Sequence, residues 1–253
     1  MKPETEESII ELYDKFQEIA AKGWIKASYN RYASVGNTFE KLLGIKMNAL
    51  ETPDYKDIEI KCKNKEGKRE NVTLFSANPD SRPFEIQRLR NTYGYPDKTL
   101  PNFKVFSIDV RASRKEFLSR KYSFLLKVDR KKKRLTLNVY DNYGYLIDSR
   151  SSWSFDLLKE KLHKKLKYLA FVNAERKYID SQLYFKYTNI DFYKLTDFDK
   201  FIELIENGNI RVSFRIGIYK YGEKLGDIYN RGTAFDLKLS ALDKLFLKID
   251  TPL

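Results

Sequence analysis

The stretch PDYKDIEIKCK, residues 53–63, combines the alternation of a β-strand with a concentration of charged side chains. Successive side chains of a strand point to opposite faces of the sheet. One face of this strand is expected to carry the charged residues Asp57, Glu59 and Lys61. The other face is expected to carry the apolar residues Ile58, Ile60 and Cys62. The apolar face predicts packing on a hydrophobic core. The charged face is either a solvated surface or a metal centre.

The charged residues of this stretch match what a metal-dependent phosphodiesterase requires. Asp54 at the entrance to the strand and Glu59 within it supply carboxylate oxygens, the ligands that Mg²⁺ prefers. The metal activates a water and neutralises charge in the transition state, and a nearby lysine such as Lys61 can orient or deprotonate that water. Spacing alone leaves a surface strand with alternating charge as the alternative. It also leaves open whether Asp57 binds metal.

The composition favours a polyanionic partner. The 253 residues include 48 lysines and arginines against 35 aspartates and glutamates, a formal net charge of +13. Nucleic acid is the commonest partner of so basic a protein, and a membrane surface is the alternative. No apolar run reaches the roughly 18 residues of a membrane span, so the chain is not expected to span a bilayer. Of the two partners, DNA is expected and a membrane is not.

The cysteine and histidine counts exclude several classes of site. The single cysteine, Cys62, excludes an internal disulfide and a cysteine-based zinc site, and the single histidine, His163, excludes a cluster of the two residue types. The acidic, polar start MKPETEESII does not resemble a signal peptide. We therefore expect a cytoplasmic protein.

Hydrophobic periodicity predicts a mixed α/β fold of two lobes. Helices are expected over residues 5–22, with Gly23 as the stop, and over 37–45, 82–94, 154–167 and 196–208. Strands are expected over residues 57–63, 71–77, 104–110, 122–129, 134–141, 144–150, 168–175 and 182–193, with a β-rich end at 210–222 and 232–240.

Local signals add detail to these expected elements. Residues 71–77 are predicted to be the hairpin partner of strand 57–63. Asn37 and Glu40 fit a capping box at the second helix, and Thr196 is expected to open the helix that Gly208 closes. The lobes are expected to be residues 1–110, mainly catalytic, and 111–253, mainly DNA-recognising, around one continuous core.

The segment PDYKDIEIK resembles the PD-(D/E)xK nuclease motif, in the version found in the MvaI/BcnI restriction endonucleases and their relative MutH. Other segments resemble that family in the same order, from about residue 20 to residue 240. They are GNTFEKLLG (36–44), TLFS (73–76), LRNTYG (89–94), WSFDLLKEKLHKKLKYLA (153–170), RIGIYKYGEKLG (215–226) and RGTAF (231–235). The resemblance implies a restriction-endonuclease-like mixed β-sheet flanked by helices, with two lobes around a DNA-binding cleft.

The family's active site can be carried over position by position. The resemblance implies that Asp54 and Glu59 bind Mg²⁺, or Mn²⁺ as a substitute, together with the carbonyl oxygen of Ile60. Lys61 takes the place of the catalytic lysine. Glu40 falls on the helix glutamate that helps to position metal or water.

Candidates for DNA contacts lie in two regions. SRPFEIQRLRNTYGYPDK (81–98) places arginines among tyrosines, which suits a DNA-facing loop, although a solvated basic helix is the alternative. Arg215 falls on an arginine of the family's base-reading C-terminal region. The DNA-binding candidates are Arg88, Arg90, Tyr93, Arg215, Asn230, Arg231 and Asp236.

The sequence departs from the family in the second of these regions. Tyr229, Asn230 and Arg231 stand where the best-known members have His-Asp-His, and Asp236 stands where an arginine is expected. These losses put the family's CC-x-GG target in doubt for this chain. Asp236 has two open roles, since it can accept from cytosine N4 or serve the structure alone.

The predicted function is a Mg²⁺-dependent, sequence-specific double-stranded DNA endonuclease of a type II restriction system. The resemblance implies in-line attack that leaves a 5′-phosphate and a 3′-hydroxyl, action as a monomer, and a cognate DNA methyltransferase as genetic partner. The alternatives are a MutH-like enzyme that nicks DNA for repair and a non-catalytic DNA-binding protein. Intact Asp54, Glu59 and Lys61 argue against the last of these.

Overall fold

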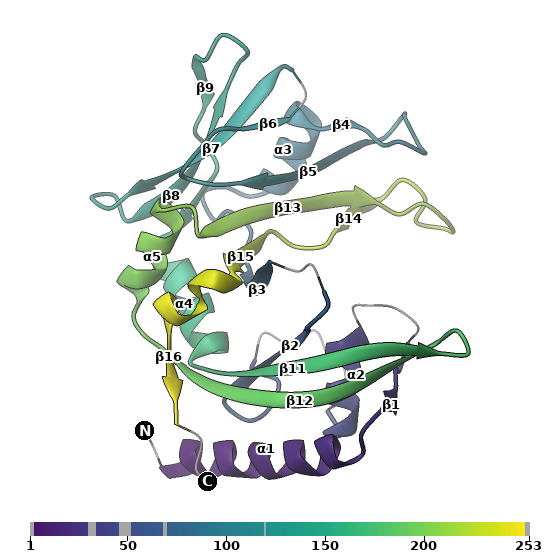
Figure 1. Ribbon diagram of the computed structural model, residues 1–253. Coiled ribbons are helices and arrows are strands. Elements are labelled where there is room, and N and C mark those ends of the chain that lie inside the picture. The colour runs from purple at the N-terminus through teal and green to yellow at the C-terminus, as the bar shows by residue number, and fades with distance from the viewer. Residues whose placement is uncertain (1–2, 30–33, 46–51, 68–69, 119, 251–253) are drawn as a thin grey trace. The chain divides into compact units, whose positions relative to one another are not determined.

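The computed structural model describes residues 3–29, 34–45, 52–67, 70–118 and 120–250 of the chain (Figure 1). The chain forms two compact units. Unit 1 contains Met1–Glu70, Leu162–Thr196 and Asp243–Leu253, and unit 2 contains Asn71–Lys161 and Asp197–Leu242. This arrangement differs from the expected division near residue 110, because the chain leaves unit 1 after residue 70 and returns to it twice.

Unit 1 is built on a five-stranded sheet in the order β1–β12–β11–β2, with β16 also paired to β12. Its strands are β1 (Ile25–Lys26), β2 (Ile58–Asn64), β11 (Tyr168–Ile179), β12 (Gln182–Leu195) and β16 (Phe246–Ile249). Strands β11 and β12 form a long antiparallel hairpin (Figure 1). Its turn residues, Asp180 and Ser181, both have positive φ, as a two-residue turn matching the strand twist requires.

The predicted hairpin between residues 57–63 and 71–77 is wrong. Strand β3 (Asn71–Ser76) belongs to unit 2, where it pairs with β15 (Ala234–Lys238). Strand β2 pairs in parallel with β11 instead, and it lies at the edge of the unit 1 sheet. The segment between β2 and β3 therefore connects two units rather than two paired strands.

Helix α1 (Pro3–Ala21) is the amphipathic helix that the sequence predicts. Its apolar residues at positions 9, 12, 16 and 19 are buried, and Gly23 follows with a φ of 69°. Helix α2 (Ser34–Leu42) includes Asn37. Asn37 is therefore inside the helix rather than its N-cap, and the predicted capping box with Glu40 is wrong.

The alternation predicted for β2 is confirmed. Ile58 and Ile60 are buried in a core shared with α1, α2, β11 and β12, and Cys62 packs against that core. Fully burying an isoleucine side chain stabilises a fold by about 1.5–3 kcal/mol. A one-residue shift of the strand would exchange its faces. This burial therefore directs Glu59 and Lys61 to the opposite face.

Unit 2 contains a five-stranded and a six-stranded sheet. The five-stranded sheet has the order β10–β8–β7–β6, and β9 also pairs with β8. The six-stranded sheet has the order β3–β15–β13–β5–β4, and β14 also pairs with β13. The remaining strands are β4 (Tyr95–Pro96), β5 (Lys104–Val110), β6 (Glu116–Leu118), β7 (Tyr122–Asp129), β8 (Arg134–Tyr140), β9 (Leu146–Asp148), β10 (Ser152–Ser154), β13 (Ile210–Ile218) and β14 (Ile228–Asn230). The meander expected over residues 122–150 is confirmed as β7, β8 and β9.

Aromatic side chains fill the core of unit 2. Trp153 is fully buried, and its indole Nε1 donates to the carbonyl oxygen of Ala77 at 2.9 Å. Its ring centroid lies 6.1 Å from that of Phe214 and 5.8 Å from that of Phe235. This core ties strands of the two sheets together within the unit.

The other helices are α3 (Glu85–Tyr93), α4 (Phe155–Leu166), α5 (Phe198–Glu206) and the short α6 (Leu242–Leu245), which follows the 3₁₀ turn Leu239–Ala241. The expected cap of α5 needs one correction. The side chain of Asp197, not Thr196, accepts from the backbone N–H of Lys200 at 2.8 Å. Thr196 donates instead to the carbonyl oxygen of Leu245 at 2.7 Å.

The predicted α/β class is confirmed by these sheets and helices. Among the helices that the structure describes, none has the length and apolar character needed to cross a membrane.

Candidate active site

A tight turn in unit 1 carries Asp54 to the edge of β2. Tyr55 and Ile58 exchange both of their backbone hydrogen bonds, at 3.0 and 2.8 Å, and Lys56 between them has a φ of 51°. The turn brings Asp54 alongside the strand, and its Oδ2 accepts from the backbone N–H of Ile60 at 3.0 Å. Because the N–H and C=O of one strand residue point to the same side, the Ile60 carbonyl faces this edge as well.

Glu59 is fully buried, and one of its carboxylate oxygens contacts the ammonium groups of two lysines. Its Oε1 contacts the Nζ of Lys61 and lies 3.3 Å from the Nζ of Lys165. Its Oε2 is buried and has no hydrogen-bond partner among the described residues. A buried carboxylate oxygen without a partner is costly, so this oxygen is where a cation would be stabilised.

The pKa of Glu59 is raised to about 7, with burial as the largest cause; Lys61 and Lys165 oppose the rise, and the charge of Asp54 adds to it. Burial also raises the pKa of Glu40, as does Asp54, again against the two lysines. Five charged side chains of unit 1 thus act on one another, as the sequence predicted for four of them.

Lys165 is the member of this group that the sequence did not single out. It lies in the last turn of α4, immediately before the strand that pairs with β2. Its neighbours Leu162 and Leu166 are buried at helical spacing, so the helix face was readable from the sequence. The pairing of β11 with β2 brings the lysine to Glu59, and that contact spans more than a hundred residues of sequence.

Asp57 contacts helix α1. Its Oδ2 accepts from the hydroxyl of Thr5 at 2.7 Å, and its Oδ1 is buried without a partner among the described residues. The contact to α1 favours a structural role for Asp57.

Helix α1 also holds the turn that precedes β2. The two carboxylate oxygens of Glu11 contact the hydroxyl of Tyr55 and the ammonium group of Lys56, respectively. Together with the bond from Thr5 to Asp57, these contacts fix both ends of the turn. The turn in turn sets the position of Asp54.

The donor set suits a hard divalent cation with few protein ligands. Among the described residues, no three His, Cys, Asp or Glu side chains group closely enough to hold a metal. Two carboxylates and a backbone carbonyl at the edge of β2 are the oxygen ligands available. Mg²⁺ commonly binds one or two carboxylates and keeps several waters, so the residues fit that ion.

Two of the predicted DNA-binding residues serve inside unit 2 instead. The guanidinium group of Arg88 donates to Glu85 at 2.7 Å, to Asp148 at 2.6 Å and to Ser151 at 2.8 Å. Tyr93 is buried and its hydroxyl donates to Asp148 at 2.7 Å. The network differs from the DNA-facing role expected of both residues, because it buries two carboxylates that require these donors.

Asp236 also has internal partners. It is buried, and it accepts from the hydroxyls of Thr73 at 2.6 Å and Ser213 at 2.7 Å. Arg211 lies 3.4 Å from it. Of the two roles that the sequence left open, this environment favours the structural one over cytosine recognition.

Of the remaining candidates, Arg90 lies in α3, Arg215 in β13 and Asn230 in β14, and Arg231 begins the RGTAF segment. Arg215 donates to the carbonyl oxygens of Arg231 at 3.1 Å and Gly232 at 3.4 Å, and so orders this segment. The guanidinium group of Arg231 lies over the ring of Tyr229. Arg90 is partly exposed and donates to the neighbouring Asn91.

Comparisons with known proteins find relatives over most of the chain. The model of the MvaI/BcnI restriction endonuclease family matches residues 13–246. A solved structure of restriction endonuclease MvaI with its cognate DNA substrate is similar at 31% sequence identity and a TM-score of 0.89, covering 98% of each chain. A structure of MvaI without DNA is similar at 31% identity and a TM-score of 0.64, covering 100% of this chain and 99% of that one.

Among curated proteins, none matches the chain. The family match spans most of the chain, and the likeness to MvaI covers nearly all of it at over 30% identity. The resemblance first drawn from the motif and its neighbouring segments is thereby confirmed. The chain belongs to the MvaI/BcnI restriction endonuclease family and is a type II site-specific deoxyribonuclease.

Proposed function

We propose that the protein is a Mg²⁺-dependent endonuclease that cuts double-stranded DNA at a specific sequence and leaves 5′-phosphate and 3′-hydroxyl ends. The observation that carries the proposal is the environment of Glu59, a buried carboxylate with two lysines on one oxygen and none on the other. Restriction endonucleases generally use divalent metal ions, and the oxygen donors of this site favour Mg²⁺, with Mn²⁺ as a substitute.

In this proposal, Asp54, Glu59 and the carbonyl of Ile60 hold the ion at the edge of β2. When bound, the cation lowers the pKa of water and offsets charge on the scissile phosphate. Glu40 adds a further negative charge near the ion and orients the attacking water. The water attacks phosphorus in line, the P–O3′ bond breaks, and the 3′ oxygen takes a proton from solvent.

The two lysines have separate tasks in this scheme. Lys61, on the strand beside Glu59, orients or deprotonates the attacking water. Lys165 holds Glu59 in its ionised form and faces the phosphate from α4. Lys165 keeps positive charge where the transition state gains negative charge, and Lys61 adds the same charge once it holds the proton of the attacking water.

Double-stranded DNA is the proposed partner, and MvaI, a solved relative, is known in complex with its cognate DNA substrate. The basic excess supplies contacts to phosphates, and Arg90, Arg215, Asn230 and Arg231 are the proposed contacts near the bases. We further propose that the enzyme acts as a monomer in the cytoplasm, beside a cognate methyltransferase that protects host DNA.

The direct test is incubation of the purified protein with unmethylated phage DNA, with Mg²⁺ and with EDTA. Discrete fragments that require Mg²⁺ are expected, and sequencing their ends gives the site, the cut position and the end chemistry. Nicked circles without fragments would indicate a nicking enzyme of the MutH kind instead. Absence of any cleavage of DNA from several sources would reject the proposal.

The contact of α1 with the turn predicts a role for Glu11 in metal affinity. Glu11→Gln removes the negative charge that holds Lys56 and weakens the acceptor for Tyr55, so Asp54 is less well positioned. The Mg²⁺ concentration for half-maximal cleavage should rise by about tenfold, the low end for groups behind metal ligands. Direct Mn²⁺ titration provides a readout independent of activity.

Glu18→Gln is the matched control for this prediction, because Glu18 lies exposed on the same helix. It should leave the metal requirement unchanged. Equal metal affinity in the Glu11 and Glu18 variants would show that the contacts of Glu11 with Tyr55 and Lys56 do not position Asp54.

A further inference from the structure

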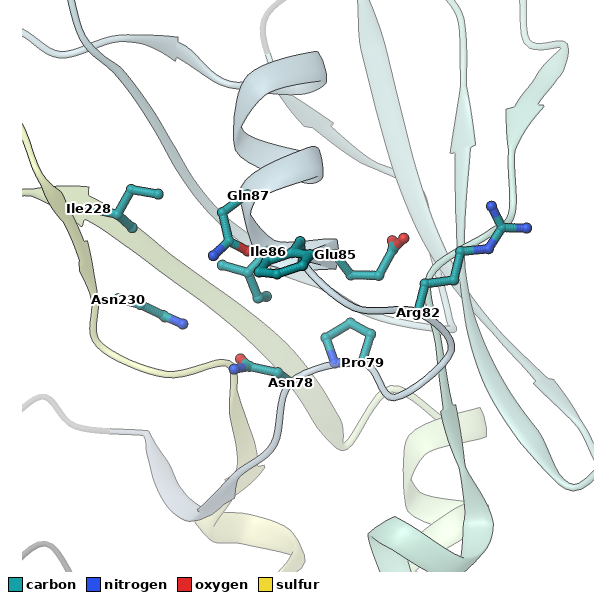
Figure 2. Close-up of a pocket in the computed structure, with 9 residues that line it drawn as sticks. Asn78, Pro79, Arg82, Glu85, Ile86, Gln87, Ile228 and Asn230 are labelled. Carbon is teal, nitrogen blue, oxygen red and sulfur yellow. The ribbon is translucent and has the colours of Figure 1, made fainter.

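A pocket lies within unit 2. It encloses about 200 Å³, and residues from the segment before α3, from α3 itself and from β14 line it. Figure 2 shows the amide groups of Asn78, Gln87 and Asn230 directed toward one shared space. Ile86 and Ile228 provide apolar lining on its walls.

Two of the three amides are fixed by their own oxygens. The Oδ1 of Asn230 accepts from the backbone N–H of Gly232 at 2.9 Å. The Oδ1 of Asn78 accepts from the hydroxyl of Thr233 at 3.1 Å, and Thr233 is fully buried. With each oxygen engaged, each amide offers its Nδ2 hydrogens, so both side chains act as donors toward the pocket.

The carboxylate at the pocket does not compete for these donors. Both oxygens of Glu85 accept from Arg88, and one also contacts the hydroxyl of Ser151. Arg82 also lines the pocket, but Figure 2 shows its guanidinium group directed away from the three amides. The pocket therefore favours a ligand edge that is rich in hydrogen-bond acceptors.

Phe84 adds an unusual feature to the pocket. Its backbone has a φ of 58°, in the left-handed region that bulky residues rarely occupy, and the residue is 77% exposed. Such a conformation costs on the order of 1 kcal/mol, and such strain clusters at functional sites. Exposing an aromatic ring gains nothing in the folded protein alone, so a bound partner is where this ring would find contacts.

We propose that this pocket receives the major-groove edge of a guanine in the recognition sequence, with the Nδ2 groups of Asn78 and Asn230 donating to it. The inference rests on the proposed DNA cleavage. Guanine presents two neighbouring acceptors, N7 and O6, whereas adenine offers one acceptor beside a donor, and thymine one beside a methyl group. Phe84 packs on the apolar face of the adjoining sugar or base.

The first test exchanges donors for acceptors without changing shape. Asn78→Asp and Asn230→Asp keep the oxygen that accepts from Thr233 or Gly232 and replace the pocket-facing NH₂ by an oxygen. Each should slow cleavage of the mapped site by about tenfold or more, the factor expected for a lost base contact. Asn142→Asp adds the same charge at an exposed residue outside the pocket and should cut at the normal rate.

The second test identifies the base. Duplexes carry 7-deazaguanine, which lacks the N7 acceptor, at one guanine of the mapped site at a time. At one position the modified base should slow the unaltered enzyme and add no further loss in one of the two variants, Asn78→Asp or Asn230→Asp, because the contact of that amide with N7 is already absent. The same losses in all enzymes at every position would overturn the proposal. Coupling only to 3-deazaguanine, which lacks the minor-groove acceptor N3, would also overturn it.

Phe84→Gly tests the pocket with a variant that is expected to fold normally. Glycine adopts a φ of 58° without strain, so thermal melting should show no loss of stability, while binding to the mapped duplex weakens several-fold. Unchanged binding by this variant and normal cleavage by both aspartate variants would reject the pocket as a base site. Failure of the unaltered enzyme to cut any DNA would instead reject the proposed function.

Discussion

Replacing Glu59 by glutamine is expected to abolish DNA cleavage in a protein that stays folded. Glutamine has the same shape but no charge, so the oxygen that would bind the cation loses its main attraction for it. The rate at saturating Mg²⁺ should fall by at least about a thousandfold, a loss of some 4 kcal/mol of transition-state stabilisation. Single-turnover cleavage of a plasmid with one mapped site measures this loss.

Stability and DNA binding separate this prediction from simple unfolding. The pKa of Glu59 is raised to about 7, chiefly by burial, which means that the folded protein resists the ionised form of this carboxyl. A neutral glutamine avoids that penalty, so the melting temperature of the metal-free protein should not fall. DNA affinity should largely survive, because contacts to phosphates are spread over many basic residues.

Lys61→Ala should give the same pattern of lost cleavage and retained binding. Cleavage within tenfold of the normal rate in either purified variant would contradict the assignment of the site. Glu18→Gln, on the exposed face of α1, controls for loss of one carboxylate from unit 1 and should cut normally.

Local patterns were sufficient to predict most elements of the fold. The apolar spacing that predicted the first helix gives the buried face of α1, and the strands expected over 104–110 and 122–129 have those bounds in β5 and β7. In each case the decisive interactions lie within a few residues of sequence, where helical and strand periodicity can be read. The face of β2 that carries Glu59 was predicted for the same reason.

Strand pairing was not available from local patterns. Residues 57–63 and 71–77 were expected to pair because they are close in sequence, yet β2 pairs with β11 and β3 with β15. Parallel strands are joined by long connections, so the residues of an edge strand do not indicate which distant strand it pairs with. Lys165 was not predicted as a site residue for the same reason, because its position beside Glu59 depends on the pairing of β11 with β2.

Counts of charged residues were equally unable to show which charges are paired. Arg88 and Tyr93 lie in a basic, aromatic stretch that suits DNA, and the structure commits both to Asp148. The acidic partner comes from β9, more than fifty residues away, so the sequence around α3 could not reveal it. Asn78 and Gln87, which line the pocket of unit 2, carry no charge and belong to no motif.

Lys165→Met is expected to slow cleavage by about a hundredfold at pH 7 and to make the rate more dependent on pH. The ammonium group lies 3.3 Å from the Oε1 of Glu59 and opposes the rise in the pKa of that carboxyl. Without it the pKa of Glu59 rises further, so a larger fraction of the enzyme holds a proton where the cation must bind. The acidic limb of the pH–rate profile should therefore move to higher pH, and part of the lost rate should return as the pH is raised.

Methionine keeps the apolar stem of the lysine, so the packing of α4 is preserved while the charge is lost. Lys164→Met is the matched control, because Lys164 is the adjacent exposed lysine on the same helix and should affect neither the rate nor its pH dependence. A uniform loss of rate at every pH would assign Lys165 to the phosphate alone, since a contact to phosphate does not alter the ionisation of Glu59. A normal rate at pH 7 would place Lys165 outside the reaction altogether, and the contact with Glu59 would then serve only to neutralise a buried charge.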